Sequence, residues 1–340
     1  MRLHPELTIR MRILLFGDGA WAAGSLLQLA ADHNAIGVVI RKSPSDRALE
    51  EAAKKVGLPV FQPDNVNAPE FVDKIAALSP DLSLSISYNQ ILKAPVLETA
   101  RLGFVNFHAG KLPFYRGRNV INWAIINGET EIGLTAHFVD DGIDTGDIIL
   151  QREFPILWTD TYGDVLNRIV DNLPGFVVET VERIAGGHFD TLQQSHLPGT
   201  YFTGREDGDE WLNWSDSSVN LYNKVRAITR PGPGARTLLG DKVTLIWRAF
   251  YNPAWPKYIA TPGQVIGRSD DGVLVKTGDS LLLVQEVQVS DRACEAPFWR
   301  IGTRLGIDVA SSMQTVLARL DQLERQLLSR VEEKDAASAR

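Results

Sequence analysis

The chain has 340 residues, of which 35 are Lys or Arg and 42 are Asp or Glu, so its net charge at pH 7 is −7. Apolar residues make up 44% of the chain, which allows a packed core and excludes a disordered or fibrous protein, and the length suffices for two domains. The single cysteine, Cys294, can form neither an internal disulfide nor a thiolate metal cage, and the net acidity argues against a dedicated nucleic-acid binder.

We expect no signal peptide at the N-terminus. No apolar stretch there follows a basic start and ends at a small-residue cleavage site. The chain also lacks a charge-free apolar run of about eighteen residues, the length of a membrane-spanning helix. We therefore expect a soluble cytoplasmic protein with no membrane partner. The first strand opens at Met11, so residues 1–10 are an extension or Met11 is the true start.

The first third of the chain alternates short apolar strands with helices of about ten residues. The predicted strands are 12–16, 35–40, 60–61 and 82–87, and the predicted helices between them are 21–31, 45–56 and 68–78. Such alternation is typical of a parallel sheet with helices on both faces. We therefore expect an α/β domain with a Rossmann-like, mostly parallel sheet.

Gly17, Gly19 and Gly24 after the first strand match only part of the dinucleotide-binding fingerprint. Its third glycine belongs three residues after the second, where this chain has Ala22. We interpret the glycines as a tight strand-to-helix turn, and dinucleotide binding is the less favoured alternative.

The middle of the chain continues the pattern and then ends the domain. A strand at 103–108, a polar loop at 109–118, a helix at 120–127, strands at 134–139 and 147–154, and a long helix at 161–185 are predicted. Gly186 and Gly187 end the long helix. A segment rich in Gly, Thr, Asp and Pro, residues 195–210, is the candidate linker.

Beyond the linker, the pattern of predicted elements changes. A helix at 219–228 precedes a Pro-Gly-Pro-Gly break at 231–234, and short strands follow at 242–249, 263–267, 272–276 and 281–289. Short strands separated by glycines predict a small β-rich, OB-like domain. The expected domains are therefore 1–200, 201–300 and a helical tail at 301–340.

The tail carries one apolar stripe on a helix over about 311–333. Its apolar residues recur at spacings of three and four: Met313, Val316, Leu320, Leu323, Leu327 and Val331. The helix either docks on its own domain or forms a short coiled coil. The second interpretation gives a homodimer through the C-terminal domain or helix.

Asn106 and His108 stand at i and i+2 at the end of a predicted strand, so they project from the same face. Open parallel sheets place their ligands at this edge. An amide donor beside an imidazole suits a reaction that develops an oxyanion and moves a proton near neutral pH. A structural Asn/His pair is the alternative.

Three acids crowd a glycine-bearing loop after the strand at 134–139. Asp140, Asp141 and Asp144 follow the strand, and their spacing does not match the calcium loop of an EF-hand. A carboxylate from this loop can hold the imidazole or accept a proton. Spacing alone does not identify which acid does so.

Two segments together strongly resemble the formyltransferases that use N10-formyltetrahydrofolate, most closely those that act on nucleotide sugars. They are NFHAGKLPFYRGRNVINWAIINGE at 106–129 and FVDDGIDTGDII at 138–149. The resemblance extends over about residues 11–290 and includes methionyl-tRNA formyltransferase. It implies that Asn106, His108 and Asp144 are catalytic, that an amine attacks the formyl carbon, and that neither a thiol nor a metal takes part.

The resemblance also implies where the folate and the second substrate bind. The pterin ring is expected beside Gln90, Ile91, Leu92, Val139, Asp140, Asp141, Gly142 and Ile143. The acceptor is expected near Arg116, Arg118, Tyr222, Asn223 and Arg226. A structural role as a loop anchor is an equal alternative for Arg116.

The expected acceptor is a dTDP-, UDP- or GDP-linked amino sugar destined for a cell-surface polysaccharide. In the family, enzymes acting on methionyl-tRNA carry a basic insertion after the second strand, whereas here the segment 41–47 is short. Methionyl-tRNA and a hydroxyornithine-type siderophore precursor are the alternatives. A binding protein that keeps the fold, or a hydrolase that releases formate, is a different class that also stays open.

Overall fold

The computed structural model describes residues 10–43, 45–187, 189–194, 198–306, 313–314 and 316–327. It divides the chain into two compact units. The first holds the chain up to Asp209 together with Arg226–Pro233, and the second holds Glu210–Val225 and the chain from Gly234 onward. The boundary thus lies about ten residues beyond the expected one, and a short later segment returns to the first unit.

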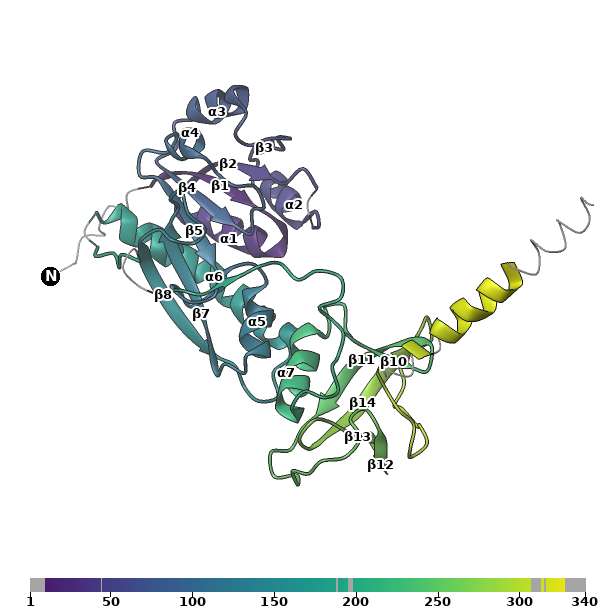
Figure 1. Ribbon diagram of the computed structural model, residues 1–340. Helices are drawn as coiled ribbons and strands as arrows, with labels where there is room; N and C mark the ends of the chain where they lie inside the picture. The colour runs from purple at the N-terminus through teal and green to yellow at the C-terminus, as the bar shows by residue number, and fades with distance from the viewer. Residues whose placement is uncertain are drawn as a thin grey trace, which may run out of the picture. The chain divides into compact units, whose positions relative to one another are not determined.

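The first unit contains a seven-stranded sheet in the order β3-β2-β1-β4-β5-β7-β8. Its strands are β1 (Arg12–Gly17), β2 (Asn34–Ile40), β3 (Val60–Phe61), β4 (Leu82–Ile86), β5 (Phe104–His108), β7 (Glu131–Phe138) and β8 (Ile148–Pro155). The first five are parallel to one another, β7 runs antiparallel to β5, and β8 runs antiparallel to β7. The predicted mostly parallel sheet is confirmed (Figure 1).

Helices cover both faces of this sheet. They are α1 (Gly19–Asp32), α2 (Ala48–Lys55), α3 (Pro69–Ala76), α4 (Ala94–Leu97), α5 (Val120–Ile126) and α6 (Tyr162–Ala185). On one face, α3 and α4 share a buried cluster with Phe16 and Phe104. Phe107 of β5 instead meets Phe176 of α6, and because side chains alternate along a strand, α6 lies on the opposite face. The α1 helix packs along α6.

The glycines in and after the turn between β1 and α1 allow neighbouring groups to pack closely. A Cβ at Gly17 would lie 2.6 Å from that of Ala22, and Gly19 has a left-handed φ of +63°. Gly24 lets Pro174 of α6 approach closely, because a Cβ there would lie 3.3 Å from its ring. These contacts give the glycines packing roles in the fold.

Helix boundaries follow local capping. At α6, the Thr161 side chain accepts from the N–H of Asp164, whose carboxylate accepts in return from the N–H of Thr161, a capping box. The α2 helix begins at Ala48, three residues later than expected, because Ser45 donates its N–H to the Asp18 carboxylate at 3.0 Å and does not act as the cap.

The second unit is built on an antiparallel five-stranded sheet in the order β10-β11-β14-β13-β12, with β10 (Ala235–Leu239), β11 (Lys242–Phe250), β12 (Val265–Ser269), β13 (Gly272–Lys276) and β14 (Leu281–Val289). Single bridges join Leu239 to Leu305 and Gln264 to Arg304, so one short segment pairs near both edges of the sheet. The predicted β-rich domain is confirmed.

Residues 313–314 and 316–327 of the tail are helical and drawn in yellow in Figure 1. The apolar residues of the predicted stripe that the structure describes are exposed, so no docking of this helix on its own domain is observed. Val331 lies outside the described residues. Among the helices of the described residues, none is long and apolar enough to cross a membrane.

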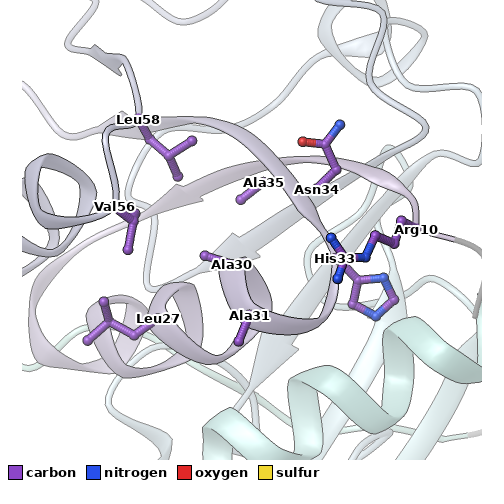
Figure 2. A pocket seen from close by; sticks show the side chains of 9 residues that line it. All are labelled: Arg10, Leu27, Ala30, Ala31, His33, Asn34, Ala35, Val56 and Leu58. Carbon is purple, nitrogen blue, oxygen red and sulfur yellow. The ribbon is translucent and has the colours of Figure 1, made fainter.

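A cavity of about 670 Å³ opens at the end of α1, where Leu27, His33, Val56 and Leu58 are among its lining residues (Figure 2). It lies at the amino end of β2, which begins at Asn34. The predicted catalytic residues lie at the carboxyl end of β5, and the parallel strands place these two ends at opposite edges of the sheet. The cavity is therefore separate from the candidate active site.

Candidate active site

Asn106 and His108 lie within the last three residues of β5, and their side chains project from one face as the spacing predicts. The neighbouring strand β7 runs antiparallel, and its register places His137 directly opposite Asn106 and Thr135 opposite His108. Cross-strand partners in such a ladder share a face. The pairing therefore brings a second imidazole into the predicted site.

His137 binds Asn106 in a defined way. Its Nδ1 lies 2.7 Å from the carbonyl oxygen of Phe138, which can only accept, so Nδ1 carries the proton. The Nε2 lone pair then accepts from Nδ2 of Asn106 at 3.1 Å. Nδ2 of Asn106 donates its second hydrogen to Oδ1 of Asp144, and the two atoms lie 3.3 Å apart. Asn106 therefore donates inside the cluster, and it can donate to a substrate oxyanion only by exchanging one of these bonds.

Asp144 is the acid that reaches the two histidines. It lies in the loop between β7 and β8 with a left-handed φ of +54°, a conformation that aspartate tolerates better than most residues. Its Oδ2 lies 3.6 Å from Nδ1 of His108, and its Oδ1 lies 3.4 Å from Nε2 of His137. Oδ2 also accepts the backbone N–H of Gly117 at 2.8 Å. Together with Nδ2 of Asn106, four groups thus converge on one carboxylate.

The carboxylate of Asp144 is held ionised. Burial by itself favours the neutral acid, but positive charge on His108 or His137 and the hydrogen bond from the Gly117 N–H favour the anion and lower the pKa of Asp144 well below its usual range. A carboxylate anchored in this way is a fixed negative charge at neutral pH. It is placed to attract a proton and to hold it nearby.

His108 is buried and faces Asp144 with its Nδ1. Its Nε2 lies 2.6 Å from the carbonyl oxygen of Tyr115, so Nε2 carries the proton and the neutral ring turns its Nδ1 lone pair toward the carboxylate. Burial lowers the pKa of His108, while Asp144 and the Tyr115 carbonyl oppose that shift. The ring is therefore a proton acceptor whose charged form finds a carboxylate beside it. Gly110 permits this packing, because a Cβ there would lie 2.5 Å from Nε2.

The loop after β5 is held by polar contacts beneath the site. Thr135 donates its hydroxyl to the carbonyl oxygen of Gly110 at 2.7 Å, and Gln151 donates to the carbonyl oxygen of Leu112 at 2.9 Å. Gln151 also donates to the Thr135 hydroxyl. These bonds fix the backbone that follows His108.

A short strap closes over the same loop. The two-residue strands β6 (Arg116–Gly117) and β9 (Tyr201–Phe202) pair in parallel, so the strap holds the backbone that donates to Asp144. The Phe202 ring stacks on Tyr115, with centroids 5.0 Å apart and planes 6° apart, and on Trp123 at 5.7 Å. Neither the strands nor this stack were predicted from the sequence.

The segments expected to hold the pterin meet at one apolar cluster. Leu92 is buried there, and Tyr88 and Val139 pack against it, although the two segments are far apart in the chain. In the same two segments, Ile91 and Ile143 leave 74% and 58% of their surface exposed. Gln90 is used internally, because its side-chain oxygen accepts the N–H of Val66.

The acidic loop itself is tied down at one residue. Asp140 accepts from the N–H of Gly142 at 3.1 Å and from the Thr145 hydroxyl at 2.6 Å, while Asp141 and Gly142 are exposed. The loop therefore presents its backbone at the surface. Exposed apolar side chains beside backbone N–H and C=O groups suit a flat heterocycle that carries hydrogen-bond donors and acceptors at its edge.

The residues expected to contact the acceptor are mostly buried, which differs from the sequence-based expectation. The buried ones are Arg116, Tyr222, Asn223 and Arg226. Arg226 donates to the carbonyl oxygens of Leu157 and Asp160 at 3.1 and 3.0 Å, so its guanidinium is committed to the fold. Of the five, only Arg118 is exposed.

Arg116 has the alternative role that the sequence left open. Its guanidinium donates to the side-chain oxygen of Gln194 at 2.8 Å and to the Tyr201 hydroxyl at 3.0 Å. Both partners lie some eighty residues away in the chain, so the arginine anchors the loop after β5 to the segment that carries the strap.

Two residues of the cluster were missed from the sequence. His137 stands in the apolar strand LTAHF, and a histidine among buried residues was a signal, but only the antiparallel register brings it to Asn106. Gly117 contributes a backbone N–H, which leaves no mark in the sequence beyond the glycine itself.

Comparison with known proteins gives matches along both units. Residues 11–181 match the model of the formyl transferase family, and residues 206–300 match that of the formyl transferase C-terminal domain. Methionyl-tRNA formyltransferase from Desulforamulus reducens is 33% identical over 288 residues, which cover 82% of this chain and 90% of the relative.

Two solved structures share the fold. The N-formyltransferase from Helicobacter canadensis, solved with folinic acid and dTDP-3-aminofucose, has a TM-score of 0.62 at 20% identity over 81% of this chain and 99% of its own. A Mycobacterium tuberculosis protein for which a sugar N-formyltransferase activity is suggested has a TM-score of 0.56 at 25% identity, over 68% and 93%.

Proposed function

Because the chain belongs to the formyl transferase family, we propose that this N-formyltransferase moves the formyl group of N10-formyltetrahydrofolate to the primary amine of a nucleotide-linked amino sugar. The observation that carries the chemical part is the convergence of Asn106, His108 and His137 on the Asp144 carboxylate. Family membership supports N10-formyltetrahydrofolate as the formyl donor, and the cluster provides groups that can move the protons of the reaction.

In the proposed reaction, the amine of the acceptor attacks the formyl carbon and loses one proton, and the folate nitrogen leaves with one proton. Asp144 receives the amine proton directly or through water, because its carboxylate is ionised and oriented by Gly117. The proton then rests between Oδ2 of Asp144 and Nδ1 of His108, where the imidazolium and the carboxylate stabilise each other.

Asn106 completes the arrangement. Its side-chain oxygen is left facing away from the two Nδ2 contacts and can accept an N–H of the incoming amine. Rotation of the amide instead offers a donor to the oxygen of the formyl group as charge develops there. Either role positions the amine or the oxyanion beside Asp144.

The acceptor part of the proposal rests on the segment between β2 and α2. Its basic side chains are paired with carboxylates of the same unit: Arg41 with Asp18 at 2.7 Å, Lys42 with Asp64 at 3.0 Å, and Arg47 with Glu50 at 3.4 Å. Affinity for a nucleic-acid backbone comes mainly from cations that neutralise phosphates. A short segment whose cations are already paired favours a small acceptor over tRNA.

Methionyl-tRNA is the second candidate acceptor. It is favoured by the 33% identity to an enzyme of that name, which exceeds the identity to either solved structure described above. The two candidates differ in size and charge, so they are separable by direct competition.

The test incubates the purified chain and N10-formyltetrahydrofolate with a panel of nucleotide amino sugars or with methionyl-tRNA, and measures formylated product by mass spectrometry. We expect kcat/KM for one nucleotide sugar to exceed that for methionyl-tRNA by about 100-fold or more, a difference of about 3 kcal/mol. Faster formylation of methionyl-tRNA contradicts the acceptor assignment but leaves formyl transfer standing.

A further inference from the structure

The C-terminal helix, residues 313–314 and 316–327, carries an apolar face that its own unit leaves uncovered. The large apolar side chains on it are between 41% and 63% exposed: Met313, Val316, Leu317, Leu320, Leu323 and Leu327. The matches to the formyl transferase models end at residue 300, so this helix is an addition to the two matched domains. An exposed apolar face of this size marks an interaction surface.

The spacing along this face is that of a coiled-coil seam. Met313, Leu320 and Leu327 recur every seven residues, and Val316 and Leu323 stand three residues after the first two of them. This places the first three at the a positions and the other two at the d positions of a heptad. A face with that repeat fits a second helix carrying the same repeat.

The charged residues that flank the seam identify that second helix. Arg319 occupies a g position and Glu324 the following e position, five residues later. In a parallel pair of helices, the residue at a g position of one helix lies against the residue at the following e position of the other. Two copies of this chain therefore bring Arg319 of each against Glu324 of the other, and both contacts are attractive.

We propose that the C-terminal helix, residues 313–314 and 316–327, forms a parallel two-stranded coiled coil with a second copy of this chain, which makes the enzyme a dimer. The seam is only about two heptads long in the described residues, and isolated short helices are marginal in water. The dimer is therefore expected to dissociate on dilution.

Sedimentation velocity of the full chain over a range of concentrations tests the proposal. The wild type is expected to sediment at twice the chain mass and to shift toward monomer when diluted. Leu323→Asp places two charges in the seam and raises the dimer dissociation constant by about 100-fold or more. Gln322→Asp is the matched control, because it adds the same charge one position away, outside the seam, and leaves the dimer unchanged.

Charge reversal tests the parallel pairing. Arg319→Glu and Glu324→Arg each create like-charge contacts and weaken the dimer, and the double variant restores it by exchanging the signs. A monomeric wild type, a trimer or tetramer, or a Leu323→Asp dimer as strong as the wild type overturns the proposal. A double variant no stronger than the single variants overturns the parallel arrangement. Enzymatic activity is measured in parallel to confirm that each variant is folded.

Discussion

At the scale of single residues, the proposed chemistry depends most on Asp144. Asp144→Asn keeps the shape of the side chain and removes the charge that orients His108 and receives the amine proton. We expect kcat/KM for formyl transfer to fall by about 100-fold or more, the size of effect typical of a lost proton-transfer group. His108→Ala is expected to have an effect of the same size.

Asp171→Asn is the control for the loss of one carboxylate, because Asp171 is exposed on α6. Circular dichroism of each variant shows whether the fold is retained. Turnover within a few-fold of wild type in a folded Asp144→Asn variant removes this residue from the mechanism.

His137 is expected to act through Asn106 and Asp144, as a positioning residue. His137→Leu removes the acceptor for Nδ2 of Asn106 and leaves a buried amide hydrogen without a partner. We expect kcat to fall by about 10-fold with little change in the KM for folate, since His137 is buried among protein groups. His137→Gln, which offers a side-chain oxygen in place of Nε2, is expected to recover part of the loss. Equal kcat values for wild type and His137→Leu contradict this role.

Asn106, His108 and Asp144 could be named from the sequence because motif and resemblance together point to them. His137 could not, since its role depends on the direction of β7, and nothing in its own residues distinguishes a parallel from an antiparallel strand. Arg226 is a different case. The resemblance implied a place near the acceptor, whereas the fold buries the guanidinium against backbone carbonyls.

At the scale of secondary-structure elements, the strap formed by β6 and β9 is expected to control the position of Asp144. Gly117 has a φ of +98°, and a Cβ there would lie 2.1 Å from the carbonyl oxygen of Phe202. Gly117→Ala therefore forces β9 away from β6 and displaces the N–H that Asp144 accepts. We expect kcat/KM to fall by about 30-fold or more.

Gly57→Ala is the matched control for that variant. Gly57 also has a left-handed φ, +71°, but a Cβ there would meet nothing within 4 Å. Both variants carry the conformational cost of about 1 kcal/mol, and only Gly117→Ala carries the clash. Similar activities of the two variants, measured at a temperature where both are folded, contradict a role for the strap.

The elements with strong periodicity were predictable. The strands β13 and β14 and the long helix α6 lie within a residue of their expected bounds. A glycine opens β13, and α6 lies between its capping residue Thr161 and Gly186. The strap was not predictable. Its strands have two residues each and pair across more than eighty positions, so no local pattern marks them.

At the scale of the whole molecule, the stability of the first unit is expected to depend on pH through a buried histidine. Both ring nitrogens of His33 are buried without hydrogen-bond partners in the described structure. Burial lowers the pKa of His33 below 6.5, so the unfolded chain binds a proton more readily than the folded one. The resulting stability is present above pH 6.5 and is lost as the pH falls through that value toward the lowered pKa.

Urea denaturation at pH 7.5 and 5.5 measures this loss. His33→Phe is expected to reduce the difference in unfolding free energy between the two pH values, since it removes the titrating group. Equal differences for the wild type and the variant contradict the assignment to His33.

The net charge of −7 is also a property of the whole molecule, and the structure refines its meaning. Each cation of the segment between β2 and α2 is paired with a carboxylate, so the described residues of this segment carry no unpaired positive charge. In the family's tRNA enzymes the same region is expected to be basic. The sequence indicated a short segment. The pairing depends on Asp18 and Asp64, which other elements bring to it.

The most direct test of the account measures tetrahydrofolate release and formylated amine together, with wild type and Asp144→Asn, in the presence and absence of the amino-sugar acceptor. We predict one tetrahydrofolate for each formylated amine, no release without the acceptor, and loss of both products in Asp144→Asn. Formate release without any amine, at a rate comparable to transfer, identifies a hydrolase and contradicts the account.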